Sequence, residues 1–137
     1  MKNRKVFVAC DSKNIKRVKE IIRSTQNLNI KIGYKFGLEF LNSKNGRKFI
    51  SKLKNKITFG DYKLSDIPNT CVSSIKAVKD LKFNYITIHL NSGLRAIKAA
   101  KKISGKTKLP GCVGMIASDV WRCEIKLWSF STVVVLD

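Results

Sequence analysis

The sequence predicts an α/β fold, in which the strands of a parallel sheet alternate with helices. Two observations predict it. Short, β-branched apolar runs recur along the chain, and segments with the apolar period of an amphipathic helix lie between them. Because parallel strands need a crossover connection that is usually helical, this alternation indicates successive βα units, four of them clear and a fifth possible.

The elements expected from this pattern follow one another without a linker that would divide the chain. The expected strands are VFVA at 6–9, NIKIGY at 29–34, KITF at 56–59, YITIH at 85–89 and a weaker LPGCVGMIA at 109–117. The expected helices cover 14–25, 46–54, 70–81 and 92–103, with Ser12 and Ser92 as N-cap candidates. We therefore expect a single domain over 1–137, with a divergent tail over 118–137. Pro110 counts against a regular central strand near that tail.

The charge of the chain is strongly positive. Its 137 residues carry 28 Lys and Arg against 9 Asp and Glu, a net charge of +19. One explanation is a nucleic-acid partner, and the other is a lysine-rich composition without a specific role. Because the basic residues are spread along the whole chain, we expect no nucleic-acid partner. A phosphorylated small molecule is equally compatible with this charge.

The cysteines and the apolar runs limit where the protein can be located and which metals or disulfides it can contain. No apolar run is long enough to cross a membrane, and no signal peptide is evident, so a cytoplasmic location is expected. The four cysteines, at 10, 71, 112 and 123, form no C-x-x-C pair, and His89 is the single histidine. We therefore expect neither a metal site nor disulfides. We expect Cys10 and Cys112 to be small core residues.

Ionisable residues follow four successive expected strands. They are Asp11, Lys35, Asp61 with Lys63, and His89. The carboxyl ends of parallel strands meet at one edge of a sheet, where α/β enzymes place their chemistry. The alternative is that each is a solvated loop residue. Their occurrence at four strand ends in a row favours a site.

The stretch GDYKLSDIPNT, residues 60–70, concentrates the charges of this site. If the strand extends through Asp61 and Lys63, both side chains point to the same face. A lysine flanked by Asp61 and Asp66 keeps its proton, which suits a proton donor and not a Schiff-base amine. With Lys35 it would form an alternating Lys-Asp-Lys-Asp array. A substrate carboxylate held against an aspartate is destabilised relative to a transition state in which its charge departs, which indicates decarboxylation.

This stretch resembles the D-x-K-x-x-D-I-P-N-T signature of the orotidine 5′-phosphate decarboxylases. VACDS, KFGLE and ITIHLNSG resemble the ends of that family's first, second and fourth strands, and the likeness covers about residues 5–111. The resemblance implies part of a TIM (β/α)8 barrel. It also implies a lyase that converts orotidine 5′-phosphate to UMP and CO₂ in pyrimidine synthesis, without metal or cofactor.

The resemblance assigns a role to each residue of the site. Lys63 would deliver a proton to C6 of the pyrimidine, and Asp61 would lie against the departing carboxylate. Lys35 and Asp11 would hold ribose hydroxyls and complete the charge array. These four residues would act within one subunit.

Three further residues would act on the neighbouring subunit. In the family, the second aspartate of the signature enters the partner's site, so the resemblance implies that Asp66, Ile67 and Thr70 work in trans in a homodimer. A complete barrel takes about 250 residues. We therefore expect a half-barrel with bare edge strands and impaired activity, because the family's phosphate-binding loops follow later strands. A non-catalytic remnant, a basic nucleotide- or nucleic-acid-binding protein, and a half-barrel that pairs with a second chain stay open as alternatives.

Overall fold

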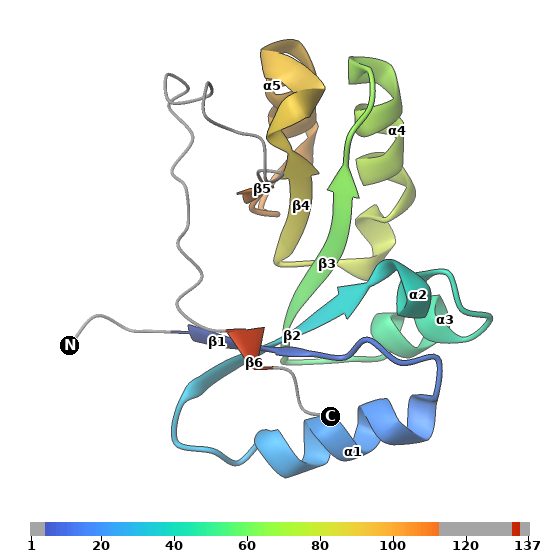
Figure 1. The fold of residues 1–137 in the computed structure, drawn as a ribbon, viewed down its shortest axis with the longest axis vertical. Helices are drawn as coiled ribbons and strands as arrows, with labels where there is room; N and C mark the ends of the chain where they lie inside the picture. Colours follow the sequence, from blue (N-terminus) through green and yellow to red (C-terminus); the bar gives the residue numbers. More distant parts are fainter. Residues whose placement is uncertain (1–4, 113–132, 135–137) are drawn as a thin grey trace. The chain divides into compact units, whose positions relative to one another are not determined.

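The computed structural model describes residues 5–112 and 133–134 (Figure 1). The chain divides into two compact units, Met1–Asp61 with Ser129–Asp137, and Tyr62–Trp128. Strand β3, Ile57–Leu64, begins in the first unit and ends in the second. The single domain over 1–137 stays a prediction, and most of the tail lies outside the described residues. Within the described ranges, no helix has the length and apolar character needed to span a bilayer.

The first unit contains a parallel sheet in the order β6-β1-β2-β3. Its elements are β1 (Lys5–Ala9), α1 (Ile15–Thr25), β2 (Lys31–Gly37), α2 (Leu38–Leu41), α3 (Gly46–Ser51), the first part of β3, and β6 (Val133–Val134). The register aligns Ala9 with Lys35 and Lys35 with Phe59. Lys35 therefore stands on a strand with a neighbour on each side.

Aromatic side chains fill the core of this unit. Phe36 and Phe40 are fully buried and stack with their ring centroids 5.2 Å apart. Phe7 meets Phe59 edge to face at 5.3 Å. A Cβ at Gly33 would lie 2.5 Å from the Phe7 ring, so this strand position leaves room for no side chain. This packing fixes β1, β2 and β3 side by side under the site described below.

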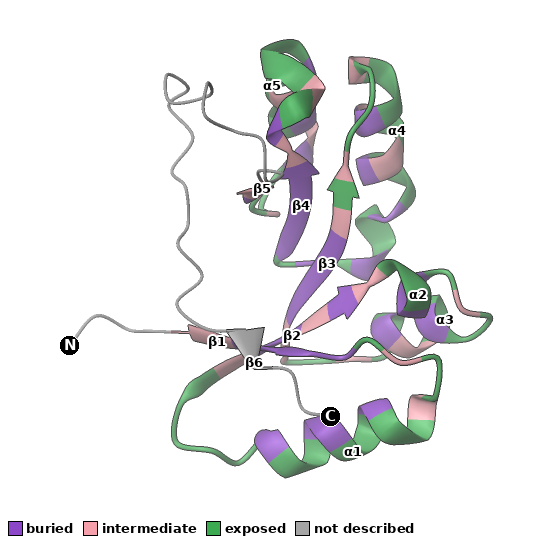
Figure 2. Ribbon diagram, viewed as in Figure 1, coloured by how far each residue is buried: buried purple, intermediate pink, exposed green. Residues whose placement is uncertain are grey.

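The second unit continues the alternation of helices and strands. It contains the end of β3, α4 (Pro68–Ala77), η1 (Lys79–Leu81), β4 (Tyr85–His89), η2 (Leu90–Ser92), α5 (Gly93–Ser104) and β5 (Gly111–Cys112). Figure 2 shows β4 buried along most of its length, and β4 pairs in parallel with β5. Its core gathers Cys71 and Ile75 of α4, Ile88 of β4, and Ala96 and Ala100 of α5. The two alanines are the fully buried α5 residues of this core, and Ile97 and Ile103 of the same helix pack against it while partly exposed.

The predicted alternation of strands and helices is confirmed, but two strands are longer than predicted. Lys35 lies inside β2, and both Asp61 and Lys63 lie inside β3. β2 continues because its neighbours still bond to it there: the Cys10 N–H donates to the Lys35 carbonyl at 2.8 Å, and Gly37 aligns with Asp61. The charged residues Lys35, Asp61 and Lys63 therefore mark the site, and the strands continue through them.

Of the two predicted serine caps, Ser92 does occupy the N-cap position of α5, whereas Ser12 is not the cap of α1. α1 is capped by Asn14, whose Oδ1 accepts from the Lys16 N–H at 2.9 Å. The Ser12 hydroxyl accepts instead from the Asn14 N–H at 3.2 Å. Ser92 precedes α5 but makes no side-chain cap, because its hydroxyl donates to the Leu64 carbonyl at 2.9 Å.

Two expectations about the ends of the sheet also change. Pro110 precedes β5 and offers its carbonyl to the Ile88 N–H at 3.1 Å, so its missing N–H interrupts no ladder there. The outer edge of β1 is not bare. It pairs with β6, which aligns Phe7 with Val133.

Candidate functional site

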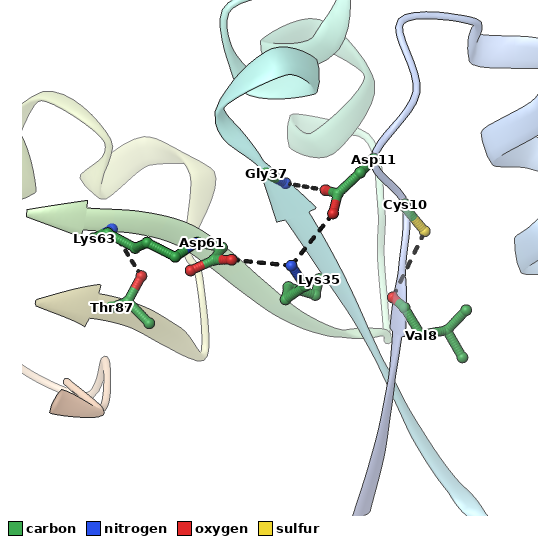
Figure 3. Close-up of polar contacts among 8 residues, drawn as sticks. All are labelled: Val8, Cys10, Asp11, Lys35, Gly37, Asp61, Lys63 and Thr87. Atoms are coloured by element: carbon green, nitrogen blue, oxygen red, sulfur yellow. Dashed lines mark hydrogen bonds and ion pairs between the residues drawn. The ribbon is translucent and has the colours of Figure 1, made fainter. Parts of the chain in front are cut away.

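Lys35 stands between two carboxylates (Figure 3). Its Nζ lies 2.9 Å from Asp61 Oδ2 and 3.3 Å from Asp11 Oδ2. The Asp61 side chain is 9% exposed, that of Lys35 15% and that of Asp11 42%. The three charges therefore run from the protein interior to the solvent, and the innermost one is negative.

Neighbouring strands bring these three residues together. Asp61 lies opposite Gly37 in the pairing of β3 with β2, and Asp11 follows the end of β1 by two residues. Parallel strands present their carboxyl ends at the same edge of a sheet. The structure thus confirms that Asp11, Lys35 and Asp61 gather at this edge, as the sequence predicts.

A backbone group fixes the outer carboxylate. The Gly37 N–H donates to Asp11 Oδ1 at 2.6 Å, while Oδ2 of the same carboxylate faces Lys35. A Cβ on Gly37 would lie 2.5 Å from Asp11 Oδ1. Since Gly37 has an ordinary φ of −82°, a larger residue there would disturb the Asp11 carboxylate and not the backbone conformation.

The surroundings of Lys35 strengthen its positive charge. Burial by itself lowers the pKa of a lysine, but the hydrogen bond and charge of Asp61, followed by those of Asp11, more than offset it. The pKa of Lys35 is therefore raised above its ordinary value. Lys35 can hold anions and hydroxyl oxygens, and it cannot serve as a neutral amine nucleophile.

Cys10 lies directly behind this charge cluster and is fully buried. Burial, and then the negative charge of Asp11, raise the pKa of its thiol to about 12, although Lys35 acts in the opposite direction. The Cys10 Sγ contacts the Val8 carbonyl at 3.9 Å. The predicted role of Cys10 as a small core residue is confirmed, and its thiolate is disfavoured at neutral pH.

We expect Cys10 to resist thiol reagents in the folded chain. At mildly alkaline pH its alkylation should be about 100-fold or more slower than in urea, because the thiolate is the reactive form. Since folding raises the thiol pKa, stability linked to Cys10 should be present below its unfolded value of 9.0 and fall as pH rises toward 12. Peptide mapping after iodoacetamide labelling measures the rates, with the half-buried Cys112 as the internal comparison. Equal rates in folded and unfolded chain would contradict the expectation.

Lys63 adopts an unusual backbone conformation. Its φ is 46°, in the left-handed region, and its N–H donates to the Thr87 hydroxyl at 2.9 Å. A left-handed lysine costs about 1–2 kcal/mol, and such residues concentrate at functional sites. The alternation of an extended strand does not hold at such a residue. β3 does extend through Asp61 and Lys63, and the shared face of the two side chains stays a prediction.

The loop after Lys63 has its own internal contacts. The Asp66 carboxylate accepts from the Ile67 N–H at 2.7 Å, and the Asp66 carbonyl accepts from the Cys71 thiol at 3.3 Å. Ile67 is 66% exposed, although it is large and apolar. Pro68 begins α4, two residues before the predicted start at residue 70, and Thr70 is exposed in its first turn.

His89 ends β4, as predicted, and its Nδ1 accepts from the Asn91 N–H at 3.2 Å. This bond leaves Nε2 as the protonated nitrogen of the neutral ring. Among the described residues, no group of three His, Cys, Asp or Glu side chains is placed to hold a metal ion.

The sequence interpretation missed the roles of Gly37 and Thr87. The signal for Gly37 was its place two residues after Lys35, near a carboxylate that needs a backbone donor. The signal for Thr87 was a hydroxyl in the otherwise apolar centre of YITIH. A buried hydroxyl requires a partner, so its presence in a core strand indicates a specific contact.

Comparisons with known proteins agree on one family. The family model for "Orotidine 5'-phosphate decarboxylase / HUMPS family" matches residues 4–125. Orotidine 5′-phosphate decarboxylase of a Wolbachia from Brugia malayi is 34% identical over 111 residues, covering 77% of this chain and 48% of that protein. That of Lactobacillus johnsonii is 36% identical over 104 residues, with 72% and 42% covered. The chain spans about half the length of the curated relatives it matches.

Solved structures agree with the sequence comparison. The crystal structure of orotidine 5′-phosphate decarboxylase from Lactobacillus acidophilus aligns with a TM-score of 0.66 and 32% identity, over 79% of this chain and 52% of that one. The enzyme of Methanocaldococcus jannaschii, solved with the inhibitor BMP, gives 0.69 and 25%, over 79% and 51%. The predicted fold, part of a TIM barrel, is confirmed.

Proposed function

Because the chain belongs to the orotidine 5′-phosphate decarboxylase / HUMPS family, we propose that it acts in the decarboxylation of orotidine 5′-phosphate to UMP and CO₂. One observation carries the proposal. Asp61, on the strand that also bears Lys63, has a nearly buried carboxylate, and the Lys35 ammonium of the neighbouring strand holds it. A carboxylate at such a depth is suited to act on the charge of a bound substrate, because little water is present to screen it.

The reaction requires a negative charge to leave the substrate carboxylate. Asp61 would lie against that group and raise the energy of the bound carboxylate more than that of the transition state. The bond between C6 and the carboxyl carbon then breaks. CO₂ departs, and the electron pair of the broken bond stays on C6. The Lys63 ammonium would give a proton to C6, which leaves UMP and a neutral lysine. Lys35 and Asp11 would hold ribose hydroxyls.

The expected rate of the chain by itself follows from the share of its relatives that it covers. Since the chain covers 48% and 42% of the first two relatives, we expect turnover by the chain alone to be far below that of a full-length relative. Contacts remote from the reacting atoms, above all to the phosphate, supply much of the transition-state stabilisation when a substrate carries a phosphate handle. The charge cluster around Lys35 would support a low rate without them.

A homodimer is part of the proposal. Asp66, Ile67 and Thr70 would enter the site of a second copy and act there in trans. Ile67 is 66% exposed, so it is accessible for such a contact. We also propose a cytoplasmic location, consistent with the buried thiols of Cys10 and Cys71, which form no disulfide.

Replacing Lys63 by alanine tests the proposed reaction. We expect the decarboxylation rate of the purified chain to fall about 1,000-fold, since the proton donor is gone. Conversion of orotidine 5′-phosphate, followed by its ultraviolet absorbance, measures the rate. Lys82→Ala is a matched control, because Lys82 is also an exposed lysine with positive φ, 51°, in the same unit. No conversion by the unaltered folded chain, or an equal loss in both variants, would overturn the proposal.

A further inference from the structure

We propose that Thr87 and Ser92 are positioning residues for Lys63: their hydroxyls hold the backbone of β3 in the left-handed turn that sets the direction of the Lys63 side chain. The inference rests on the proposed function of Lys63 as the proton donor. It adds two residues of the β4–η2 segment to the site, neither of which need touch the substrate. Both act through the backbone of the neighbouring strand.

The first contact is at the strained residue itself. The Lys63 N–H donates to Thr87 Oγ1 at 2.9 Å, and Thr87 is 4% exposed. The acceptor is thus a side chain fixed in the interior of β4, where rotamer changes are restricted by packing. A threonine is stiff about χ1, so its oxygen is a well-defined anchor for one backbone N–H.

The second contact is one residue later. The Ser92 hydroxyl donates to the Leu64 carbonyl at 2.9 Å, instead of capping α5. The N–H of Lys63 is therefore bound by the hydroxyl of Thr87 in β4, and the C=O of Leu64 by the hydroxyl of Ser92 in η2. Together they fasten the chain on both sides of the peptide unit that joins Lys63 to Leu64.

Fixing this peptide unit has a consequence for catalysis. A left-handed residue in a strand redirects its own side chain relative to the strand alternation, so the path of the Lys63 ammonium depends on φ at this residue. An extended backbone would send the ammonium elsewhere. Displacing a catalytic group by about 1 Å can cost about 100-fold in rate. The two hydroxyls would therefore govern the rate of proton delivery and have little influence on substrate affinity.

Thr87→Val and Thr87→Ser test the inference as a pair. The valine keeps the shape of threonine without the hydroxyl, and the serine keeps the hydroxyl. Amide hydrogen exchange and the three-bond HN–Hα coupling of Lys63, measured by NMR on the full chain, report the hydrogen bond and φ without requiring activity. We expect faster exchange and a coupling that moves toward the extended value in Thr87→Val only, with Ser92→Ala giving a smaller change of the same kind.

The kinetic part of the test separates positioning from stability. We expect Thr87→Val to lower kcat about 10- to 100-fold with KM nearly unchanged, and Thr87→Ser to stay within about 3-fold. Thr107→Val is the control, because the Thr107 hydroxyl also bonds a backbone group of the same unit: it donates to the Phe83 carbonyl at 2.9 Å. It should leave both Lys63 readouts and kcat unchanged.

Three outcomes are distinguishable. Unchanged exchange and coupling at Lys63 in Thr87→Val would overturn the positioning role, whatever the kinetics. Altered NMR parameters with unchanged kcat in an active chain would overturn the link to catalysis. An unaltered chain without decarboxylase activity would contradict the proposed function, while the NMR comparison would still decide whether the hydroxyls set the backbone at Lys63.

Discussion

Replacing Lys35 by methionine is expected to lower the free energy of unfolding by about 3 kcal/mol at neutral pH. The substitution keeps an unbranched side chain but removes the ammonium that lies 2.9 Å from Asp61 and 3.3 Å from Asp11. The Asp61 carboxylate, 9% exposed, then stays in the interior without that charge. The loss is large because water cannot replace the missing partner at this depth.

Urea unfolding of the full chain measures this effect, and the chain offers a matched control. Lys13 pairs with Glu39 at 3.2 Å, but the two side chains are 74% and 55% exposed. Lys13→Met should therefore change the free energy of unfolding by no more than about 0.5 kcal/mol. Similar losses for Lys13→Met and Lys35→Met would show that the depth of the Lys35 cluster has no energetic consequence.

The loss should depend on pH in a stated direction. In Lys35→Met the Asp61 carboxylate is buried without that ammonium, so a proton taken up in the folded variant removes the cost of burying its charge. Its stability should then recover relative to the parent as pH falls into the range where carboxylates protonate. Adding Asp61→Asn to Lys35→Met should recover part of the loss at neutral pH. A deficit that grows at acidic pH would contradict this explanation.

The fold could be predicted from the sequence because its main signals are local. Apolar residues at helical spacing over 14–25 and 92–103 correspond to α1 and α5, and the β-branched run at 85–89 is β4 residue for residue. Strand ends could not be predicted, since they depend on pairing partners. β2 reaches Gly37 because β3 pairs with it up to that residue, and nothing within residues 29–37 indicates this end.

The sequence was sufficient to predict which charged residues gather at the site. It was not sufficient to predict their conformations. Acidic and basic residues after successive strands were sufficient to bring Asp11, Lys35 and Asp61 together, because parallel strands end at one edge. The conformation of Lys63 was not predictable, since lysine has no preference for positive φ and the stabilising hydroxyl of Thr87 is distant in sequence. The hydrogen bond of Ser92 was not predictable for a related reason: Ser92 is the N-cap residue of α5, but its hydroxyl bonds the Leu64 carbonyl of another strand.

Gly37→Ala should disturb the same charge cluster from the backbone side. The new Cβ would lie 2.5 Å from Asp11 Oδ1, so the carboxylate must move and give up the N–H bond of 2.6 Å. A hydrogen bond to a charged group contributes about 1.5–3 kcal/mol, and we expect a loss of about 2 kcal/mol in the free energy of unfolding. If Asp11 holds a ribose hydroxyl, as proposed, UMP affinity measured by calorimetry should fall about 10-fold as well.

A double-mutant cycle separates this steric effect from any intrinsic cost of alanine at residue 37. Asp11→Ala removes the group that the new methyl would meet, and φ at Gly37 is one that alanine adopts readily. In the Asp11→Ala background, Gly37→Ala should therefore cost less than about 0.5 kcal/mol in the same urea measurement. If it costs the full amount there, the methyl clashes with something other than the carboxylate. The strict requirement for glycine at this strand end would then come from packing, and the Asp11 anchor would have to be held by Lys35 alone.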